Sequence, residues 1–359
     1  MALPERVRLV VLFGGQSAEH EVSCTTATHV LRAADPDRYD IVPIGITREG
    51  TWVQADDAMV ELARGAAALP RALEAAGTEV DPLPAVTPAQ ADLPVVVLPL
   101  LHGPRGEDGT VQGMLELADV PYVGSGVLSS ALCMDKVAAK RILESHGLPQ
   151  TPWLALRDHD LDGAEVAVAT EGLAYPVFVK PANLGSSVGV SKVAAPEGLA
   201  EAGILAAQYD EWVVIEEGVQ GREIEVAVLG NAEPRASVPG EIVPSHEFYD
   251  YDDKYLDGTS QLLVPAPLDT TAADRVRGLA VAAFAALRCD GMARVDFFFE
   301  ESGRGFLVNE LNTIPGFTPI SMYPKLWEAS GLPYPALIDE LVRLAVERHE
   351  RRSRFSTKR

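Results

Sequence analysis

The chain has 359 residues, which is long enough for two or three domains, and its 47% hydrophobic and 23% charged residues are ordinary for a globular protein. Its formal net charge is -22, with 52 acidic residues against 30 basic ones. A surface of this charge repels nucleic acids and anionic lipids, so neither a nucleic acid nor a membrane is an expected partner.

The first third of the chain alternates strand-like apolar runs with helical patterns, which predicts an α/β domain. Ser17 is expected to be the N-cap of a helix that continues to Ala34. Residues 55–92 are rich in alanine, proline and acidic residues, and we interpret them as an excursion with helical pieces and no assigned function. The expected strands are residues 7–13, 41–46 and 95–101. They predict an open, mostly parallel sheet in an N-terminal domain of residues 1–132.

A central domain is expected over residues 133–230 and a C-terminal domain over residues 231–359. Asp135 is expected to cap a helix that ends at Ser145, before a proline-flanked linker. In the central domain, short strands around a Gly/Ser loop and a helix predict α+β packing on an antiparallel sheet. The C-terminal domain contains a polar loop, an alanine-rich helix, a hairpin, a last helix and a basic tail expected to be disordered. These segments are residues 248–255, 271–287, 294–312, 335–350 and 351–359.

The cysteines and the N-terminal segment indicate in which cellular compartment the protein is expected. Three scattered cysteines without a CxxC pair are typical of a reducing environment and predict no zinc site. They are Cys24, Cys133 and Cys289. The N-terminal apolar run from Leu9 to Phe13 is too short for a signal peptide or a membrane span, so we expect a cytoplasmic protein.

The most informative segment is the hairpin formed by residues 294–299 and 305–312. With the turn centred on Gly303, antiparallel pairing puts Asp296 directly opposite Glu310. Because alternate residues of a strand share a face, Arg294 and Asn312 project on the same side as these two carboxylates. The opposite face is apolar and consists of Val295, Phe297, Phe299 and Leu311.

Facing carboxylates on a half-buried sheet repel each other, and a divalent cation relieves that repulsion. Asp296, Glu310 and Asn312 offer the hard oxygen ligands that Mg²⁺ takes, with phosphate oxygens and water completing its coordination. The alternative is that Arg294 neutralises Asp296 while Glu310 lies at a solvated edge. The aligned Asn312 and the Thr-Ile-Pro-Gly-Phe that follows it favour the metal site.

Several motifs accompany the hairpin in a fixed order along nearly the whole chain. They are GGQSAEHEVS at residues 14–23, HGPRGEDG at 102–109, MDK at 134–136, KPANLGSSVG at 180–189, FYDYDDKY at 248–255 and NTIPGFT at 312–318. In this combination the sequence resembles the D-alanine–D-alanine ligases of the ATP-grasp superfamily. The resemblance implies an ATP-grasp fold preceded by the open α/β domain. It also implies a reaction in which ATP phosphorylates the carboxylate of one D-alanine, after which the amine of a second D-alanine displaces phosphate.

The nucleotide-binding residues follow from the Gly/Ser loop and from the resemblance. Small residues in this loop allow backbone N–H groups to lie over phosphates, and no GxxxxGK[ST] P-loop is present. Lys180 ends an apolar strand, where an unpaired ammonium would be costly. The family pattern implies that the ATP-binding residues are Lys136, Lys180, Gly185, Ser187, Glu216, Glu217, Val219 and Glu223, the last of these at the ribose.

The resemblance also assigns the groups that surround the two amino acids. Glu19 would receive the ammonium of the first D-alanine, close to His102, while Ser186 and Tyr255 close loops over the site. Arg294 and the backbone N–H of Gly316 would stabilise the oxyanion of the tetrahedral intermediate. Ser321 and Lys254 would hold the second carboxylate and the transferred phosphate. The Thr-Pro pair at residues 318–319 predicts a helix start that puts Ser321 in the first turn.

Partners and alternatives complete the expectations. The resemblance implies Mg²⁺ or Mn²⁺, two ions per active site, a homodimer, and a role in peptidoglycan precursor synthesis. Tyr255 favours a dipeptide product over D-alanyl-D-lactate and leaves D-serine open as the acceptor. A non-catalytic ATP-grasp module would lack Arg294 or a metal ligand, and all of these are present. A nicotinamide dehydrogenase is disfavoured because no GxGxxG follows the first strand.

Overall fold

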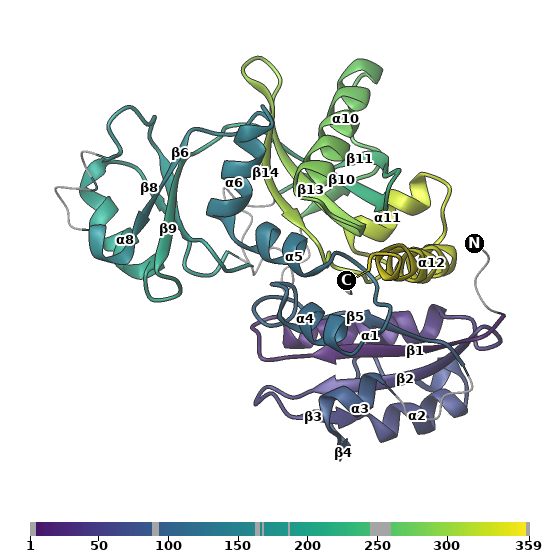
Figure 1. Cartoon of the computed structure of the whole chain (residues 1–359). Coiled ribbons are helices and arrows are strands. Elements are labelled where there is room, and N and C mark those ends of the chain that lie inside the picture. The colour runs from purple at the N-terminus through teal and green to yellow at the C-terminus, as the bar shows by residue number, and fades with distance from the viewer. Residues whose placement is uncertain are drawn as a thin grey trace.

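The protein is described from a computed structural model that covers residues 5–87, 93–161, 166, 169–185, 187–244 and 260–356. Within these residues the strands form three sheets, one in each part of the molecule (Figure 1). None of the helices in the same ranges is long and apolar enough to cross a membrane. The mixed α/β architecture agrees with the expected fold class.

The N-terminal sheet has the order β4-β3-β2-β1-β5. Its strands are β1 (Val7–Gly14), β2 (Tyr39–Ile46), β3 (Trp52–Gln54), β4 (Thr78–Glu79) and β5 (Val95–Pro99). Strand β1 pairs in parallel with β2 and β5, whereas β3 and β4 add antiparallel pairs at one edge. The sheet is open, as predicted, and its parallel strands β2, β1 and β5 lie side by side, with β5 at the edge opposite β4. The helices of this part are α1 (His20–Ala33), α2 (Asp56–Ala63), α3 (Pro82–Val86) and α4 (Thr110–Leu117), with a short 3-10 turn at Ala66–Ala68.

Helix α1 begins three residues after the predicted N-cap. Glu19, not Ser17, occupies the N-cap position. The hydroxyl of Ser17 accepts a hydrogen bond from the Glu19 N–H at 3.1 Å, so it closes the turn that precedes the helix. The predicted N-cap at Ser17 is therefore wrong, because the same side-chain chemistry that caps helices also stabilises tight turns.

The central sheet is antiparallel and has the order β6-β9-β7-β8, as predicted for this segment. Its strands are β6 (Trp153–Arg157), β7 (Val177–Pro181), β8 (Ser191–Val193) and β9 (Trp212–Glu217), and helix α8 (Leu199–Ala206) packs on it. Short 3-10 turns lie at Asp158–Asp160 and Pro196–Gly198. Helices α5 (Val127–Met134) and α6 (Lys136–Ser145) lie between this sheet and the other two (Figure 1). As predicted, Asp135 caps α6 by accepting the Ala138 N–H at 2.8 Å.

The C-terminal sheet has the order β12-β11-β10-β13-β14. Its strands are β10 (Arg222–Gly230), β11 (Arg235–Val243), β12 (Gln261–Leu263), β13 (Gly291–Glu300) and β14 (Gly305–Asn312). Helix α10 (Thr270–Ala286) covers one face, and α11 (Met322–Ala329) and α12 (Tyr334–Ser353) pack on the other. Strand β10 pairs with both β11 and β13, so the domain boundary expected after residue 230 falls inside this sheet.

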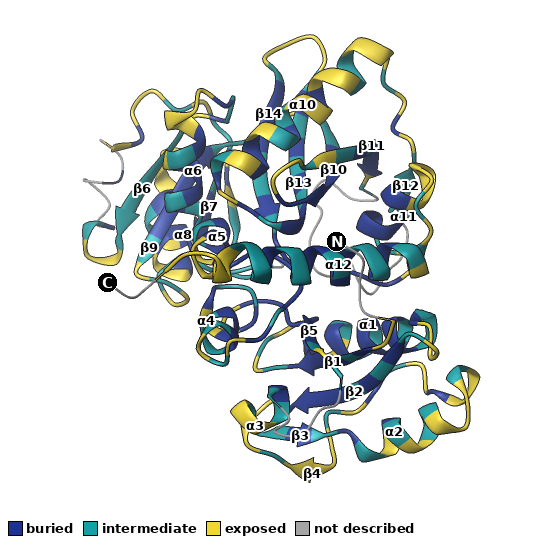
Figure 2. Cartoon of the chain, turned by 45° about the vertical axis from the view of Figure 1, so that its right-hand side comes forward, coloured by how far each residue is buried: buried dark blue, intermediate teal, exposed yellow. Residues whose placement is uncertain are grey.

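Helix α12 joins the C-terminal sheet to the N-terminal sheet. Figure 2 shows it lying between them, and its apolar residues share one hydrophobic core with those of β1, α1 and α11. Its last turn belongs to the segment expected to be disordered. The structure corrects that expectation, because the helix continues to Ser353 and two arginines of this turn form ion pairs.

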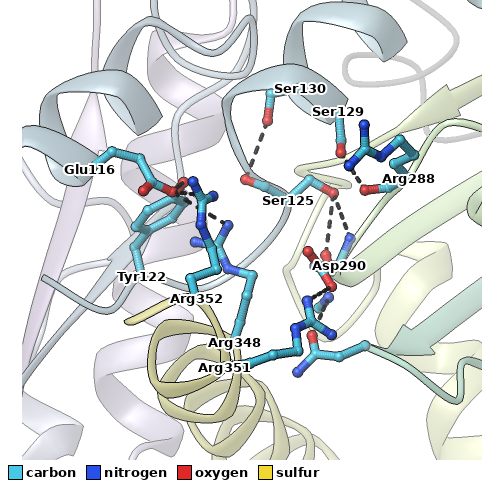
Figure 3. A network of polar contacts seen from close by, with 12 residues as sticks. Glu116, Tyr122, Ser125, Ser129, Ser130, Arg288, Asp290, Arg348, Arg351 and Arg352 are labelled. Carbon is cyan, nitrogen blue, oxygen red and sulfur yellow. Dashed lines mark hydrogen bonds and ion pairs between the residues drawn. The ribbon is translucent and has the colours of Figure 1, made fainter. Parts of the chain in front are cut away.

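Those ion pairs belong to a polar network at the junction (Figure 3). Glu116 of α4 accepts hydrogen bonds from the Tyr122 hydroxyl and from Arg352, each at 2.7 Å. The guanidinium of the buried Arg348 lies 3.9 Å from the centre of the Tyr122 ring. Arg351 pairs with Asp290, immediately before β13, at 2.6 Å. The network therefore fastens the N-terminal domain to the strand that carries the expected metal ligand.

Candidate active site

The β13–β14 hairpin has the predicted pairing at its functional end. Asp296 lies opposite Glu310 and Arg294 lies opposite Asn312. Between Asp296 and Phe297 the register shifts by one residue, because Asn309 forms a β-bulge and Phe297 pairs with Val308. The apolar face predicted for the hairpin is confirmed, since its residues lie in the core beneath α10.

Arg294 organises the carboxylates on the polar face. Its Nε and Nη2 donate to the two oxygens of Asp296, each at 2.7 Å, and its Nε also lies 3.0 Å from Oε2 of Glu225. Glu225 is buried on β10, directly opposite Asp296. Nδ2 of Asn312 donates to the second oxygen of Asp296 at 2.9 Å. The ion pair between Arg294 and Asp296, which is one part of the alternative to a metal site, is thus present, and it holds the carboxylate in one orientation.

The same residues fit a divalent cation. Oδ1 of Asp296 keeps a lone pair beyond the one that accepts the arginine, whereas Oδ2 accepts from both Arg294 and Asn312, and the opposed Glu310 adds a second carboxylate. No cluster of three or more His, Cys, Asp or Glu side chains that could hold a metal occurs within the described ranges. The hairpin offers only two carboxylates and an amide, so a cation there would also need phosphate and water oxygens.

Two residues of the N-terminal domain reach this face of the hairpin. His102 follows β5, is 7% exposed, and is influenced by the charges of both Glu19 and Arg294. Burial lowers the pKa of His102 below its ordinary value; Glu19 and a hydrogen bond to the Ile314 backbone oppose this shift, and Arg294 adds to it. His102 is therefore neutral at pH 7. A β-carbon placed on Gly185 would lie 3.8 Å from Oε2 of Glu19, so the Gly/Ser loop contacts this carboxylate.

The Gly/Ser loop is held at its base by α6. Lys136, the first residue of α6, donates to the carbonyl of Leu184 at 2.5 Å. Burial lowers the pKa of Lys136, and the charge of Glu310 opposes that shift, which puts this ammonium within electrostatic reach of the hairpin. Ser187 has a positive φ of 59°, a conformation that turns the chain sharply at the loop. Lys136, Gly185 and Ser187 are thus brought together at one side of the site.

Lys180 and Glu216 form a buried group with Lys140, a residue that the sequence analysis did not assign to the site. Lys180 on β7 forms an ion pair with Oε1 of Glu216 on β9, and Lys140 on α6 lies 2.7 Å from Oε2. Burial would raise the pKa of Glu216, but the two ammonium groups lower it to about 2. The Glu216 side chain is therefore an anion between two cations.

The remaining residues that were expected to bind the nucleotide lie at the end of β9, in the β9–β10 connection and at the start of β10. Glu217 accepts hydrogen bonds from Arg304 and from the Ala174 N–H, each at 2.9 Å, which links the hairpin turn to the central sheet. Val219 lies in the connection itself, between β9 and β10. Glu223 lies on the same face of β10 as Glu225, the face that carries Asp296 on the neighbouring strand.

Gly316 and Ser321 are neighbours after β14. A β-carbon at Gly316 would lie 3.2 Å from the Ser321 hydroxyl. Ser321 is the N-cap of α11, which begins at Met322, so the predicted position of Ser321 inside the first turn is wrong. Its hydroxyl instead accepts the Thr318 N–H at 3.1 Å, which shows that the 318–321 segment is a turn before the helix. Ser321 nevertheless lies at a helix N-terminus, as predicted.

Two carboxylates near the site were not predicted from the sequence. Glu107, within the HGPRGEDG motif, accepts the Gly103 N–H at 2.8 Å. Burial raises its pKa to about 8, and the charges of Glu19 and Glu310 act in the same direction. Glu225 is the second, and the alternation of Glu223 and Glu225 along β10 was a signal that could have identified it. Ser186, Lys254 and Tyr255 lie outside the described residues.

Comparison with known proteins agrees with this arrangement. Residues 8–125 match the family model described as D-ala D-ala ligase N-terminus, and residues 142–343 match the one described as D-ala D-ala ligase C-terminus. A D-alanine–D-alanine ligase of Thermoanaerobacter sp. (strain X514) is 49% identical over 356 residues, which cover 98% of this chain and 99% of the relative. The corresponding ligase of Geobacillus kaustophilus is 46% identical over 353 residues, 96% of each chain.

Solved structures give the same result. The D-alanine-D-alanine ligase from Coxiella burnetii superposes with a TM-score of 0.79 at 36% identity and covers 98% of this chain and 97% of its own. The VanG D-Ala:D-Ser ligase from Enterococcus faecalis superposes with a TM-score of 0.81 at 36% identity and covers 95% of this chain and 99% of its own. On these matches over nearly its full length, the chain belongs to the D-alanine–D-alanine ligase family.

Proposed function

We propose that this protein joins two molecules of D-alanine into D-alanyl-D-alanine at the expense of ATP, for the synthesis of peptidoglycan precursors. The observation that carries the proposal is that the buried His102 lies within electrostatic reach of both Glu19 and Arg294, the arginine that holds Asp296 on the hairpin, in a chain of this family. An amino-acid site beside a phosphoryl-transfer site is what ligation through an acyl phosphate needs.

The first step forms the acyl phosphate. A carboxylate oxygen of the first D-alanine attacks the γ-phosphorus of ATP, a P–O bond forms, and ADP leaves with the electron pair of the broken P–O bond. In our proposal Glu19 holds the ammonium of this D-alanine, and Lys136 and Lys180 hold ATP phosphates, with the backbone of Gly185 and Ser187 over them. Glu216, Glu217 and Val219 border the adenine, and Glu223 binds the ribose. Magnesium ions at Asp296, Glu310 and Asn312, two in our proposal, would neutralise charge on the phosphates.

The second step forms the peptide bond. The amine of the second D-alanine, after loss of a proton, attacks the acyl carbon, and the tetrahedral intermediate collapses with loss of phosphate. Arg294, fixed by Asp296 and Glu225, and the N–H of Gly316 stabilise the oxyanion in our proposal. Ser321 at the α11 N-terminus receives the carboxylate of the second D-alanine. Lys254 holds the transferred phosphate, and Ser186 and Tyr255 complete the closure of the site.

The test is a phosphate-release assay with ATP and Mg²⁺, with the product identified by mass spectrometry. We expect phosphate release with D-alanine, none with L-alanine, and one dipeptide per phosphate. ATP hydrolysis at the same rate without any amino acid would contradict the ligase proposal. A mixed product from D-alanine with D-serine that exceeds the homodipeptide would replace the acceptor we propose. Chromatography with light scattering tests the homodimer that we propose, and fractionation of the source cells tests a cytoplasmic location.

A further inference from the structure

The buried group of Lys140, Glu216 and Lys180 has one more cation than the carboxylate needs. Glu216 has a side-chain exposure of 5%, and its two oxygens are divided between the two ammonium groups. Lys140 has a side-chain exposure of 2%, and its backbone carbonyl accepts a hydrogen bond from the Gln150 side chain at 2.9 Å. The Thr151 hydroxyl lies 3.4 Å from Oε2 of Glu216. The carboxylate is thus enclosed by elements from α6, β7 and β9.

The two lysines have different surroundings. Lys180 ends β7, directly before the Gly/Ser loop, and its side chain is 11% exposed. Lys140 lies one turn after Lys136 on α6, deeper in the protein, and Glu216 is its ion-pair partner in the structure. Lys180 can therefore turn toward an anion beside the loop, whereas Lys140 stays with Glu216.

Removing a cation from a buried carboxylate is costly, because the carboxylate would then have neither water nor a counter-ion to stabilise its charge. If Lys180 were the sole partner of Glu216, its transfer to a phosphate would incur this cost each time a nucleotide binds. With Lys140 in place, Glu216 keeps a counter-ion at 2.7 Å after Lys180 has moved.

We propose that Lys140 is a positioning residue for the nucleotide: by neutralising Glu216 it allows Lys180 to exchange its ion-pair partner from Glu216 to a nucleoside triphosphate. This inference rests on the proposed function, since it requires that the chain bind ATP. It assigns to Lys140 no contact with substrate, only an effect through Glu216 and Lys180.

The test measures the dissociation constant of a non-hydrolysable ATP analogue with Mg²⁺ by calorimetry, without D-alanine. Lys140→Met leaves Lys180 as the remaining ammonium beside Glu216, so the analogue should bind at least ~10-fold more weakly. The double variant Lys140→Met/Glu216→Gln removes the carboxylate that retains Lys180, so it should bind the analogue at least about threefold more tightly than Lys140→Met. The matched control is Lys192→Met on β8, which removes one exposed positive charge from the same sheet and should bind like the parent.

A purely structural role for Lys140 predicts the opposite pattern in the double variant. Affinity would then follow thermal stability, and the second substitution would give no recovery, which would overturn the inference. Unchanged affinity in Lys140→Met would overturn it too, and would leave the proposed function intact. If the parent protein itself bound no nucleotide, both the inference and the proposed function would fall. In steady-state assays we expect the change in the KM for ATP to exceed the change in kcat.

Discussion

Asp296 lies directly opposite Glu310 on neighbouring strands, and the forked guanidinium of Arg294 grips both oxygens of Asp296. The same arginine lies 3.0 Å from Glu225. Arg294 is therefore shared by Asp296 and Glu225, while Lys136 lies within electrostatic reach of Glu310. The carboxylates of the hairpin supply the negative charge that a divalent cation would need there.

Asp296→Asn should weaken metal binding strongly and protein folding only slightly. The amide keeps the shape of the side chain, and Arg294 retains Glu225 as a partner, so we expect a stability loss of about 1 kcal/mol. Loss of a carboxylate ligand should lower ATP-dependent turnover by roughly 100-fold or more at saturating ATP. Binding of Mn²⁺ followed by electron paramagnetic resonance measures the effect, with Asp274→Asn on α10 as the control. Equal Mn²⁺ affinity in both variants would remove Asp296 from the metal site.

His102 should make the protein less stable as the pH falls below 6.5. Its pKa in the folded state is lower than the ordinary 6.5, chiefly because of burial, so the unfolded chain takes up a proton that the folded chain does not. Stability contributed by neutral His102 is then lost toward acidic pH, by at most about 1.4 kcal/mol per pH unit. Urea unfolding between pH 7 and 5 should show a shallower loss for His102→Gln than for the parent. The exposed His146→Gln serves as control, and parallel curves for the parent and His102→Gln would contradict the prediction.

Glu107 should act in the opposite direction. Its pKa in the folded state is raised from 4.5 to about 8, so between these values the folded chain holds a proton that the unfolded chain releases. Stability from this group therefore falls as the pH rises from 4.5 to about 8 and is constant above. Glu107→Gln should gain stability over the parent across that window in the presence of a metal chelator. The control is Glu144→Gln on α6, and a constant difference from pH 5 to 8 would show that Glu107 is ionised throughout.

Glu116→Ala should loosen the attachment of the N-terminal domain. The substitution removes the acceptor of the Tyr122 and Arg352 hydrogen bonds and leaves the buried Arg348 without its nearest carboxylate, 3.8 Å away. We expect a loss of about 1–3 kcal/mol in the free energy of unfolding. We also expect the KM for D-alanine to rise more, relative to the parent, than the KM for ATP. The exposed Glu328→Ala on α11 is the matched control. Equal stability of the two variants would show that the network in Figure 3 does not stabilise the fold.

The sequence predicted most elements, the pairing of Asp296 with Glu310 and the apolar face of the hairpin, because strand alternation fixes which side chains share a face. It did not predict the bulge at Asn309. A turn centred on Gly303 gives the right partners for Asp296, while the true turn is displaced and the bulge restores the register. A bulge adds one residue to a strand. It cannot be recognised from the alternation of apolar and polar residues when the residues on either side of it could lie on either face of the sheet.

Other residues were missed because their significance arises only in three dimensions. Lys140, four residues after Lys136, has the spacing of a solvated helix face, and only the packing of α6 against β9 buries it beside Glu216. Arg351 and Arg352 lie in a basic run typical of a tail, yet acidic partners from distant segments extend the helix. Glu107 has an unusual environment because separate domains converge on it.

The shared core of α12 with the N-terminal sheet has a consequence for the order of events during synthesis. Strands β1, β2 and β5 and helix α1 are complete within the first hundred residues, but Leu337, Ile338 and Leu341 complete the core on which they pack. The newly made N-terminal domain therefore presents an uncovered apolar surface until residues 334–353 have been translated. Assembly of the site, which needs Glu19 and His102 beside Arg294, therefore comes late in the folding of the chain.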